Sequence, residues 1–322
     1  MSEIAESLLG LLLGFSLDLL LGWPAWLYRR IGHPVGWLAA PVTLLEARLN
    51  KPAFSNARRF VSGAVLTLSG IAVAGLIWAG LTSLAGALPL TAVWLGLLYW
   101  PLIAARSMHD HVAAVADPLE KGDLPNARIA VSMIVGRDPN RLDEAGVSRA
   151  ALESLGENTS DGIIAPIFWG VLLGPAGMAA YKAINTFDSM IAHRNSRYEW
   201  FGKCAARIDD LANLAPAPLT GFLYALTTGR RVNSVLKVMC RDAGAHRSPN
   251  AGWPESALAA ALNVRLSGPR VYDGSISPEP WLNGDCPDPD GSCVRKGLTH
   301  YRRLLALTGA GLLGLTVVAV ML

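Results

Sequence analysis

The sequence predicts an all-α integral membrane protein with about four transmembrane helices, re-entrant or interfacial broken helices, and cytoplasmic loops. Apolar residues make up 52% of the 322 residues and charged residues only 16%, whereas soluble domains carry about 25% charged residues. Residues 60–105 contain no Asp, Glu, Lys, Arg or His, and the last 19 residues are also uncharged. Part of the chain is therefore expected to face lipid.

Four segments are expected to span the bilayer, because a crossing helix needs roughly 20 apolar residues. These segments are about 4–21, 61–82, 86–105 and 304–322. The middle two would form a hairpin. The first is not interpreted as a cleaved signal peptide, because residues 1–7 carry two acids and no Lys or Arg.

Two further uncharged runs, 162–181 and 211–229, are interrupted by Pro and Gly. We expect them to be broken or re-entrant helices, within one membrane-embedded catalytic domain that covers residues 1–322. The polar residues that carry chemistry are concentrated in 153–255.

Lys and Arg occur in only three blocks, at 29–59, 106–149 and 182–303. Because a cytoplasmic excess of Lys and Arg sets membrane topology, all three blocks are expected on the cytoplasmic side, with both termini outside. The basic residues are not interleaved with stacking aromatic residues, which argues against a nucleic-acid partner. The segment with Cys286 and Cys293 matches no zinc or calcium pattern and is expected to be a solvated loop.

The first polar cluster follows residue 152. Glu153 and Glu157 stand at i, i+4, and Asn158 and Asp161 at i, i+3, so each pair shares a helix face. Like charges on one face repel unless a cation or a basic partner lies between them. We therefore expect Glu157 and Asp161 to be metal or phosphate-metal ligands. Alternatively, Asp161 caps the apolar helix that follows.

A second cluster combines Asn185 and Asp188, again at i, i+3, with Arg194 and Arg197. Magnesium binds few carboxylates together with substrate phosphates, and Arg binds phosphate with two parallel hydrogen bonds. A third cluster has the same residue types: Arg207, Asp209, Asp210 and Asn213. The alternative for each cluster is a charged helix end at the headgroup level.

Residues 248–255 read as a turn that feeds a helix, and a loop before a helix N-terminus can bind an anion. A plain turn is the alternative. His246 just before it is either a surface histidine or an acid/base or phosphate contact. Asp18 is an intramembrane carboxylate, which by default suggests a function, although it can also reach water from near the interface.

Several motifs together resemble one family. They are residues 17–22, His33-Pro34, 153–162, 185–190, 194–202, 206–210 and 248–255. This set strongly resembles the integral-membrane adenosylcobinamide-phosphate synthases of bacterial cobalamin biosynthesis, the CobD/CbiB family, from about residue 15 to 275. The sequence departs from the family pattern at Trp23, where an acid is expected, and at His193, where an aromatic residue is usual. Segment 276–298 has no family motif.

The resemblance implies an ATP-dependent amide ligase that joins adenosylcobyric acid to (R)-1-amino-2-propanol or its O-phosphate, through an acyl phosphate. The implied cofactors are ATP and Mg²⁺. The expected metal ligands are Glu157, Asp161 and Asp188. The expected ATP and phosphate contacts are Lys182, Arg194, Asn195, Arg207, Ser248 and Asn250. The expected substrate contacts are Asn158, Thr159, Asn185, Asp18, His33 and Glu255. The expected catalytic residues are Asp209, Asp210, Glu153 and His246, with Asp209 or Asp210 taking the amine proton or binding a second magnesium.

The implied location is the bacterial inner membrane, crossed several times, with the active site facing the cytoplasm. The implied partners are the corrinoid, the amine and the lipid bilayer, and either a homo-oligomer or a complex with later nucleotide-loop assembly enzymes is compatible with the sequence. Two other classes stay open. A prenyltransferase would bind an isoprenoid diphosphate through magnesium, and a transporter would use the broken helices.

Overall fold

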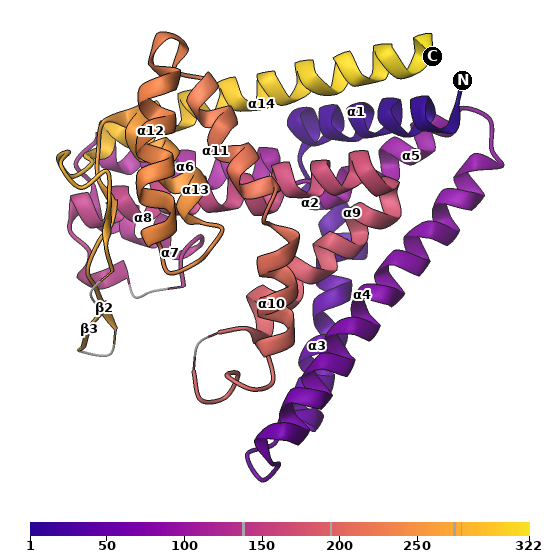
Figure 1. Cartoon of the computed structure of the whole chain (residues 1–322), viewed down its shortest axis with the longest axis horizontal. Helices are drawn as coiled ribbons and strands as arrows, with labels where there is room; N and C mark the ends of the chain where they lie inside the picture. Colours follow the sequence, from indigo (N-terminus) through magenta and orange to yellow (C-terminus); the bar gives the residue numbers. More distant parts are fainter. Residues whose placement is uncertain (137–138, 194, 273–274, 278) are drawn as a thin grey trace. The chain divides into compact units, whose positions relative to one another are not determined.

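The computed structural model describes residues 1–136, 139–193, 195–272, 275–277 and 279–322. Its described part is almost entirely helical (Figure 1), which confirms the all-α fold class. The chain divides into two compact units. Unit 1 consists of Met1–Ala104, Ala165–Asn213 and Gly309–Leu322, and unit 2 of Ala105–Ile164 and Leu214–Thr308. Each unit is described by itself.

Unit 1 contains most of the apolar helices. Its elements are α1 (Glu3–Leu21), α2 (Ala25–Ile31), α3 (Pro34–Leu49), α4 (Asn56–Gly86), α5 (Thr91–Tyr99), the 3₁₀ turn Trp100–Leu102, α9 (Ala165–Ile191) and α10 (Lys203–Ala212). The end of α14 (Gly291–Met321) also belongs to it.

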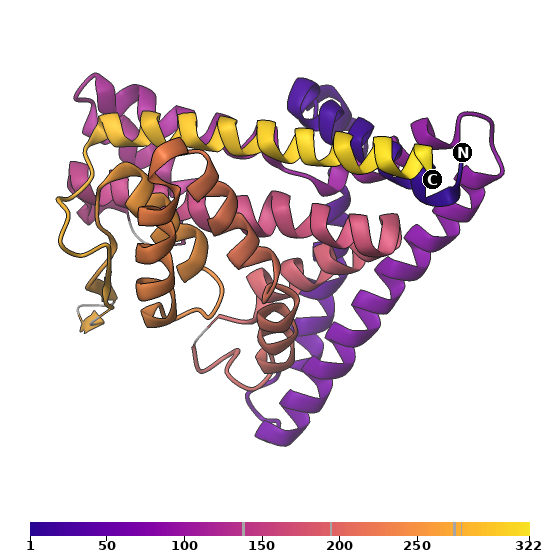
Figure 2. The same ribbon diagram turned by 45° about the horizontal axis from the view of Figure 1, so that its top comes forward.

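The long helix α9 is divided in two at Gly174. This residue has φ 67° and ψ −163°, a conformation that glycine adopts without steric cost. Pro175 then begins the second half, where its missing N–H costs no hydrogen bond. Figures 1 and 2 show that the chain reverses its direction here, so that Pro175–Ile191 runs back beside the first half.

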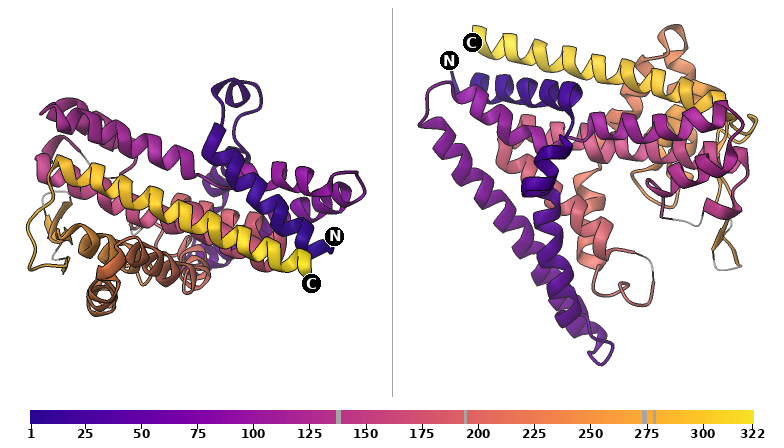
Figure 3. Two further views of the ribbon diagram at one scale, coloured as in Figure 1. Left: turned by 90° about the horizontal axis from the view of Figure 1, so that it is seen from above. Right: turned by 180° about the vertical axis from the view of Figure 1, so that it is seen from behind.

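Close helix packing holds α1 against α5 (Figure 3). A Cβ atom on Gly10 would lie 2.6 Å from the Leu95 Cβ, and one on Gly14 would lie 2.7 Å from the Tyr99 Cβ. The Tyr99 hydroxyl lies 2.8 Å from the Ser7 hydroxyl. The absence of side chains at the two glycines therefore allows the two backbones to approach closely.

The structure differs from the expectation for residues 86–105. Instead of a second span, this segment forms α5, whose nine residues reach about 14 Å, too short to cross a hydrocarbon core of about 30 Å. Leu90, with φ 59°, interrupts the helical backbone just before α5 begins. The 3₁₀ turn that contains Pro101 ends α5. Leu95, Gly96 and Tyr99 of α5 are buried, and these residues pack against α1.

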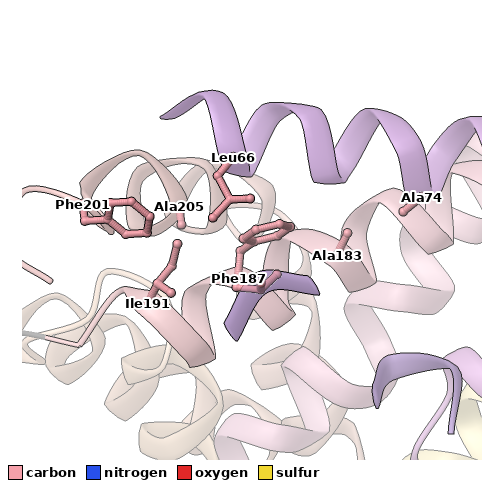
Figure 4. Packing of buried hydrophobic residues seen from close by; sticks show 8 residues of the cluster. Leu66, Ala74, Ala183, Phe187, Ile191, Phe201 and Ala205 are labelled. Atoms are coloured by element: carbon pink, nitrogen blue, oxygen red, sulfur yellow. The ribbon is translucent and has the colours of Figure 1, made fainter. Parts of the chain in front are cut away.

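The main apolar cluster of unit 1 joins α3, α4, α9 and α10 (Figure 4). Its members are Val42, Leu66, Ala74, Ala183, Phe187, Ile191, Phe201 and Ala205. Two glycines of α4 face it at very short range. A Cβ on Gly70 would lie 2.3 Å from the Phe187 ring, and one on Gly63 would lie 1.8 Å from the Phe201 carbonyl oxygen. This packing fixes the segment that follows α9.

Unit 2 contains shorter, more polar helices. Its helical elements are α6 (Ala105–Glu120), α7 (Leu124–Ser132), α8 (Glu144–Thr159), α11 (Pro216–Leu226), α12 (Val232–Asp242), α13 (Gly252–Leu262) and the start of α14. Short helical turns lie at Pro139–Arg141, Ser160–Ile164, Gly229–Arg231 and Ala243–Ala245, the second being a π turn. Strand β1 (Leu266–Ser267) pairs antiparallel with β4 (Trp281–Leu282), and β2 (Arg270–Tyr272) with β3 (Ser275–Ser277).

The segment expected to be a solvated loop, with Cys286 and Cys293, is held by ion pairs and a helix cap. The Asp288 carboxylate accepts from Arg149, at 2.5 Å, and from Arg265, at 3.0 and 2.7 Å. Asp290 caps α14 by accepting from the Cys293 amide at 3.0 Å. Both cysteines are free thiols.

Four helical runs are long and apolar enough to cross a membrane: Glu3–Leu21, Asn56–Gly86, Glu144–Ile191 and Gly291–Met321. The third run contains the break at Gly174 and includes residues 162–181. Residues 211–229 form the end of α10, a turn and the 11-residue α11. The number of candidate spans agrees with the expected four, and three of them cover the expected spans 4–21, 61–82 and 304–322. The expected span 86–105 is not among them, and the orientation of the spans stays a prediction.

We expect Gly63→Ala to lower the melting temperature of the detergent-solubilised protein, because the added Cβ would collide with the backbone of Phe201. Gly80→Ala is the matched control on the same helix. No atom lies within 4 Å of the position of its Cβ in the described part of the chain, and alanine favours a helix over glycine by about 1 kcal/mol. Equal melting temperatures for the two variants would contradict the packing at Gly63.

Candidate functional site

The C-terminal parts of α9 and α10 bring two carboxylates of unit 1 into electrostatic contact. Asp188 and Asp210 interact as like charges, although 22 positions separate them in the chain. Asp188 is half-buried, and burial strengthens the repulsion between like charges. Such a pair is stable only when a cation, a basic group or a shared proton offsets the repulsion.

Asp210 also lines a pocket of about 590 Å³ in unit 1. The other polar residues of this pocket are His193, Asn195, Ser196, Tyr198, Glu199, Lys203 and Arg207. Of the residues expected at the site, the structure therefore brings together Asn195, Arg207 and Asp210, with Asp188 beside them. Arg194 lies outside the described residues.

Two cationic side chains of the pocket, Arg207 and Lys203, make weak contacts with the part of the chain that the structure describes. The Arg207 guanidinium lies 3.4 Å from Asp210, and its side chain is 74% exposed. The Lys203 amine lies 4.9 Å from the Trp200 ring centroid. Because exposed ion pairs contribute little stability, both groups can turn toward an anion. Sequence reasoning missed Lys203, whose only signal is its place beside Gly202 in the family motif.

The loop that lines the pocket is fixed to α3 and α4 by a network that sequence reasoning also missed. Arg197 donates to both carboxylate oxygens of buried Glu46, at 3.0 and 2.8 Å. Asn50 donates to Glu46 and to the Arg197 carbonyl, and Arg59 donates to Asn50. Although burial raises it, hydrogen bonds from Arg197 and Asn50 lower the pKa of Glu46 overall. The carboxylate is therefore kept ionised.

The neighbours Asp209 and Asp210 have different surroundings. Asp209 is buried and accepts from the Asn213 amide at 3.1 Å, while the Tyr181 hydroxyl donates to Asn213 at 2.9 Å. Asp209 thus belongs to a buried network that joins α10 to α9, and Asp210 is the one that lines the pocket. Asn185 is half-buried on α9.

The motif around residues 17–34 is joined to α9 through His33 and Lys182. Lys182 is buried, 9% exposed, and interacts with His33. Burial and this positive charge lower the pKa of His33 to about 4. His33 is therefore neutral at neutral pH, and its Nδ1 accepts from the Val35 amide at the start of α3. Asp18 is buried, 3% exposed, in α1.

A second group of expected residues gathers in unit 2, on α8 and the π turn after it. Glu153 is buried and accepts from the Ser267 amide at 2.9 Å. Thr159 shares a hydrogen bond with the Tyr224 hydroxyl at 2.8 Å. Glu157 and Asn158 are exposed, and Asp161 is half-buried in the π turn, an element that often marks functional sites.

The expected loop at 248–255 packs against this part of α8. Gly156 faces Glu255, with a hypothetical Cβ 3.4 Å from the Glu255 Cα. The His246 Nε2 lies 3.8 Å from the Glu255 carboxylate, while its Nδ1 accepts from the Ser248 amide at 3.0 Å. Asn250 is buried. Two motifs almost one hundred residues apart therefore form one polar cluster.

The three expected metal ligands are divided between the two units. Glu157 and Asp161 belong to unit 2 and Asp188 to unit 1, and their joint role in binding a metal stays a prediction. Among the residues that the structure describes, no group of three or more His, Cys, Asp or Glu side chains is placed to hold a metal. A magnesium ion at Asp188 and Asp210 would therefore need further oxygen ligands from a substrate, which is how magnesium commonly binds.

Comparison with known proteins identifies the family. The model of the family described as CobD/Cbib protein matches residues 11–301. The chain belongs to this family. The chain is 55% identical over 92% of its length to a cobalamin biosynthesis protein CobD from Rhodobacter capsulatus, of which it covers 93%. It is 47% identical to the protein of that name from Brucella suis and 44% identical to the one from Rhizobium meliloti, covering 86% and 87% of each chain respectively. No solved structure matches.

The departures from the CobD/CbiB pattern have structural roles. The Trp23 indole donates to the Gly32 carbonyl at 3.0 Å, and its ring meets His33 edge-on at 4.9 Å. Trp23 therefore closes the segment before α3 and helps to bury His33. His193 contacts the Tyr198 ring, with ring centroids 5.9 Å apart, so it retains an aromatic contact.

We expect Arg197→Ala to destabilise the protein, because buried Glu46 would lose its charged donor and keep only the hydrogen bond from Asn50. The loss should appear as a lower melting temperature in detergent. Arg48→Ala is the matched control, since Arg48 is exposed on the same helix as Glu46. If both variants had the melting temperature of the unmodified protein, the network would not anchor the loop.

The low pKa of His33 predicts a pH dependence of stability. The unfolded chain protonates this residue near its ordinary pKa of 6.5, and the folded chain only near 4. Between these two pH values the unfolded chain binds a proton at His33 that the folded chain does not bind. The free energy of unfolding therefore decreases as the pH falls from about 6.5 to about 4. His33→Asn keeps a helix cap without the titration. The melting temperature of the variant should fall less than that of the unmodified protein over this pH range. An equal fall in both proteins would contradict the low pKa of His33.

Proposed function

We propose that this protein is the amide ligase of cobalamin biosynthesis that joins adenosylcobyric acid to (R)-1-amino-2-propanol or its O-phosphate, giving adenosylcobinamide or its phosphate. The observation that carries the proposal is the 55% identity to a cobalamin biosynthesis protein CobD over nearly the full chain. The pocket and the polar cluster, both built from the family's motifs, support it.

The pocket beside Asp188 suits the triphosphate of ATP. Its volume of about 590 Å³ is in the range of small-molecule sites. Arg207 and Lys203 would bind phosphate oxygens, Arg207 with two parallel hydrogen bonds and Lys203 as a point charge. Asn195 would donate a further hydrogen bond. We propose the same phosphate role for Arg194, which the sequence alone suggests.

A magnesium ion fits the carboxylates of Asp188 and Asp210. Their repulsion would become an attraction for a divalent cation, which needs only one or two carboxylates when phosphate oxygens complete its shell. Bound there, magnesium would neutralise charge on the transferred phosphoryl group. We propose Glu157 and Asp161 of unit 2 as further sites for a metal-phosphate group.

The reaction needs an activated acid, because a carboxylate does not react with an amine directly. An oxygen of the corrinoid carboxylate attacks the γ-phosphorus of ATP, and ADP leaves. The amine nitrogen then attacks the carbonyl carbon, phosphate leaves, and the nitrogen loses a proton to a base. His246, held by Ser248 and Glu255, is the proposed base, and Asp209 or Asp210 would take the proton only where it does not bind magnesium.

The remaining expected residues are proposed to hold the substrates. Asn185, Asp18 and His33 of unit 1 and Asn158, Thr159 and Glu255 of unit 2 would bind the corrinoid and the amine. Lys182, Ser248 and Asn250 would bind ATP phosphates, and Glu153 is proposed as a catalytic residue. We place the protein in the bacterial inner membrane with this site facing the cytoplasm. The three basic blocks of sequence support that orientation, and ATP is available on that side.

The purified protein in detergent should convert adenosylcobyric acid, ATP, Mg²⁺ and aminopropanol phosphate to the amide, observed by mass spectrometry. The nucleotide product should be ADP. Release of AMP and diphosphate would overturn the acyl-phosphate route, and consumption of an isoprenoid diphosphate without ATP would show a prenyltransferase.

Asp188→Asn should lower turnover by about 100-fold or more, because it removes charge stabilisation at the transferred phosphate.

Asp123→Asn is the matched control for Asp188→Asn. Asp123 caps α7 by accepting from the Asn126 amide at 3.2 Å, and asparagine caps a helix about as well. The control should retain full turnover. Unchanged turnover in Asp188→Asn would remove Asp188 from the magnesium site.

A further inference from the structure

The short helix α2 exposes aromatic and basic side chains together. Trp26, Tyr28 and Ile31 are 56%, 60% and 46% exposed, and Arg29 and Arg30 occupy the last turn. We call these five residues the α2 surface. No residue of α2 is buried by any part of the chain that the structure describes. Such exposure of large apolar rings indicates contact with something outside this chain.

The charge of this surface is uniformly positive. Between Asp18 and Glu46 the sequence contains no acidic residue. The Arg30 guanidinium lies over the Trp26 ring, 6.0 Å from its centroid, so this surface places positive charge next to an aromatic ring. A partner for the α2 surface must therefore combine negative charge with an apolar layer.

The position of α2 in the chain identifies that partner. Only Gly22, Trp23 and Pro24 separate it from α1, one of the helices able to span a membrane. The Trp100 indole donates to the Gly22 carbonyl at 2.9 Å, so this linker is held in place. Figure 3 shows α2, the dark violet turn at the top of its left panel, projecting from unit 1. A helix tied to the end of a span lies at the level of the lipid headgroups.

We propose that α2 is an interfacial anchor that binds the anionic headgroups of the membrane that α1 crosses. The Trp and Tyr rings would sit at the headgroup level, where such rings are preferred, and the arginines would pair with anionic lipid. Each arginine near an anionic surface should contribute roughly fivefold in lipid affinity. This proposal does not depend on the proposed reaction.

Hydrogen exchange of the full-length protein in nanodiscs tests the proposal. A seven-residue helix without tertiary burial is marginal by itself, so its amides should exchange rapidly in phosphatidylcholine. They should exchange more slowly when phosphatidylglycerol is mixed in. The double variant Arg29→Gln/Arg30→Gln should lose this slowing, whereas Arg29→Lys/Arg30→Lys should keep it, because lysine retains the charge.

Arg48→Gln/Lys51→Gln is the matched control, since it removes the same net charge from exposed positions at the other end of α3. It should leave the lipid-dependent slowing of α2 intact. The proposal is overturned if phosphatidylglycerol does not slow exchange in α2, or if the slowing survives the glutamine double variant. Equal protection in detergent without lipid would also overturn it, because a protein surface would then cover α2.

Discussion

The reversal of α9 at Gly174 is the constraint on which the candidate site of unit 1 depends. It directs Pro175–Ile191 back along α4, where Phe187 fits the space left by Gly70. The return places Lys182, Asn185 and Asp188 at the polar end of an otherwise apolar helix. Any other residue at position 174 would have to adopt a positive φ together with an extended ψ, a backbone conformation that is essentially restricted to glycine.

Once α9 has returned, electrostatics determine what the site can bind. Asp188 and Asp210 come from separate helices and repel each other, while Arg207 and Lys203 stand at the pocket. Acidic and basic groups arranged in this way suit a magnesium-bound phosphate better than either a free cation or a free anion. The ion pair of buried Glu46 with exposed Arg197 fixes the loop that carries Arg197 without using any group of the pocket.

The sequence predicted local features well and long-range ones poorly. Long uncharged runs gave the all-α membrane class, and helical spacing placed Asn185 and Asp188 at one helix end. Composition could not separate a span from the short helix α5 at 86–105, because the sequence stays uncharged through the 3₁₀ turn that ends this helix. The Glu46–Arg197 pair joins positions 151 residues apart, so no local pattern could reveal it. The family motifs pointed to Asp210 and Arg207. They did not show that Asp209, the neighbour of Asp210, is buried outside the pocket.

The central claim is that the nucleotide binds in the pocket of unit 1. Photo-crosslinking of the full-length protein with an azido-adenine analogue of ATP and Mg²⁺, followed by peptide mapping, tests it most directly. The account predicts that label falls on residues 195–210 and is displaced by ATP. Label confined to residues 153–161 or 246–255, displaced in the same way, would contradict it.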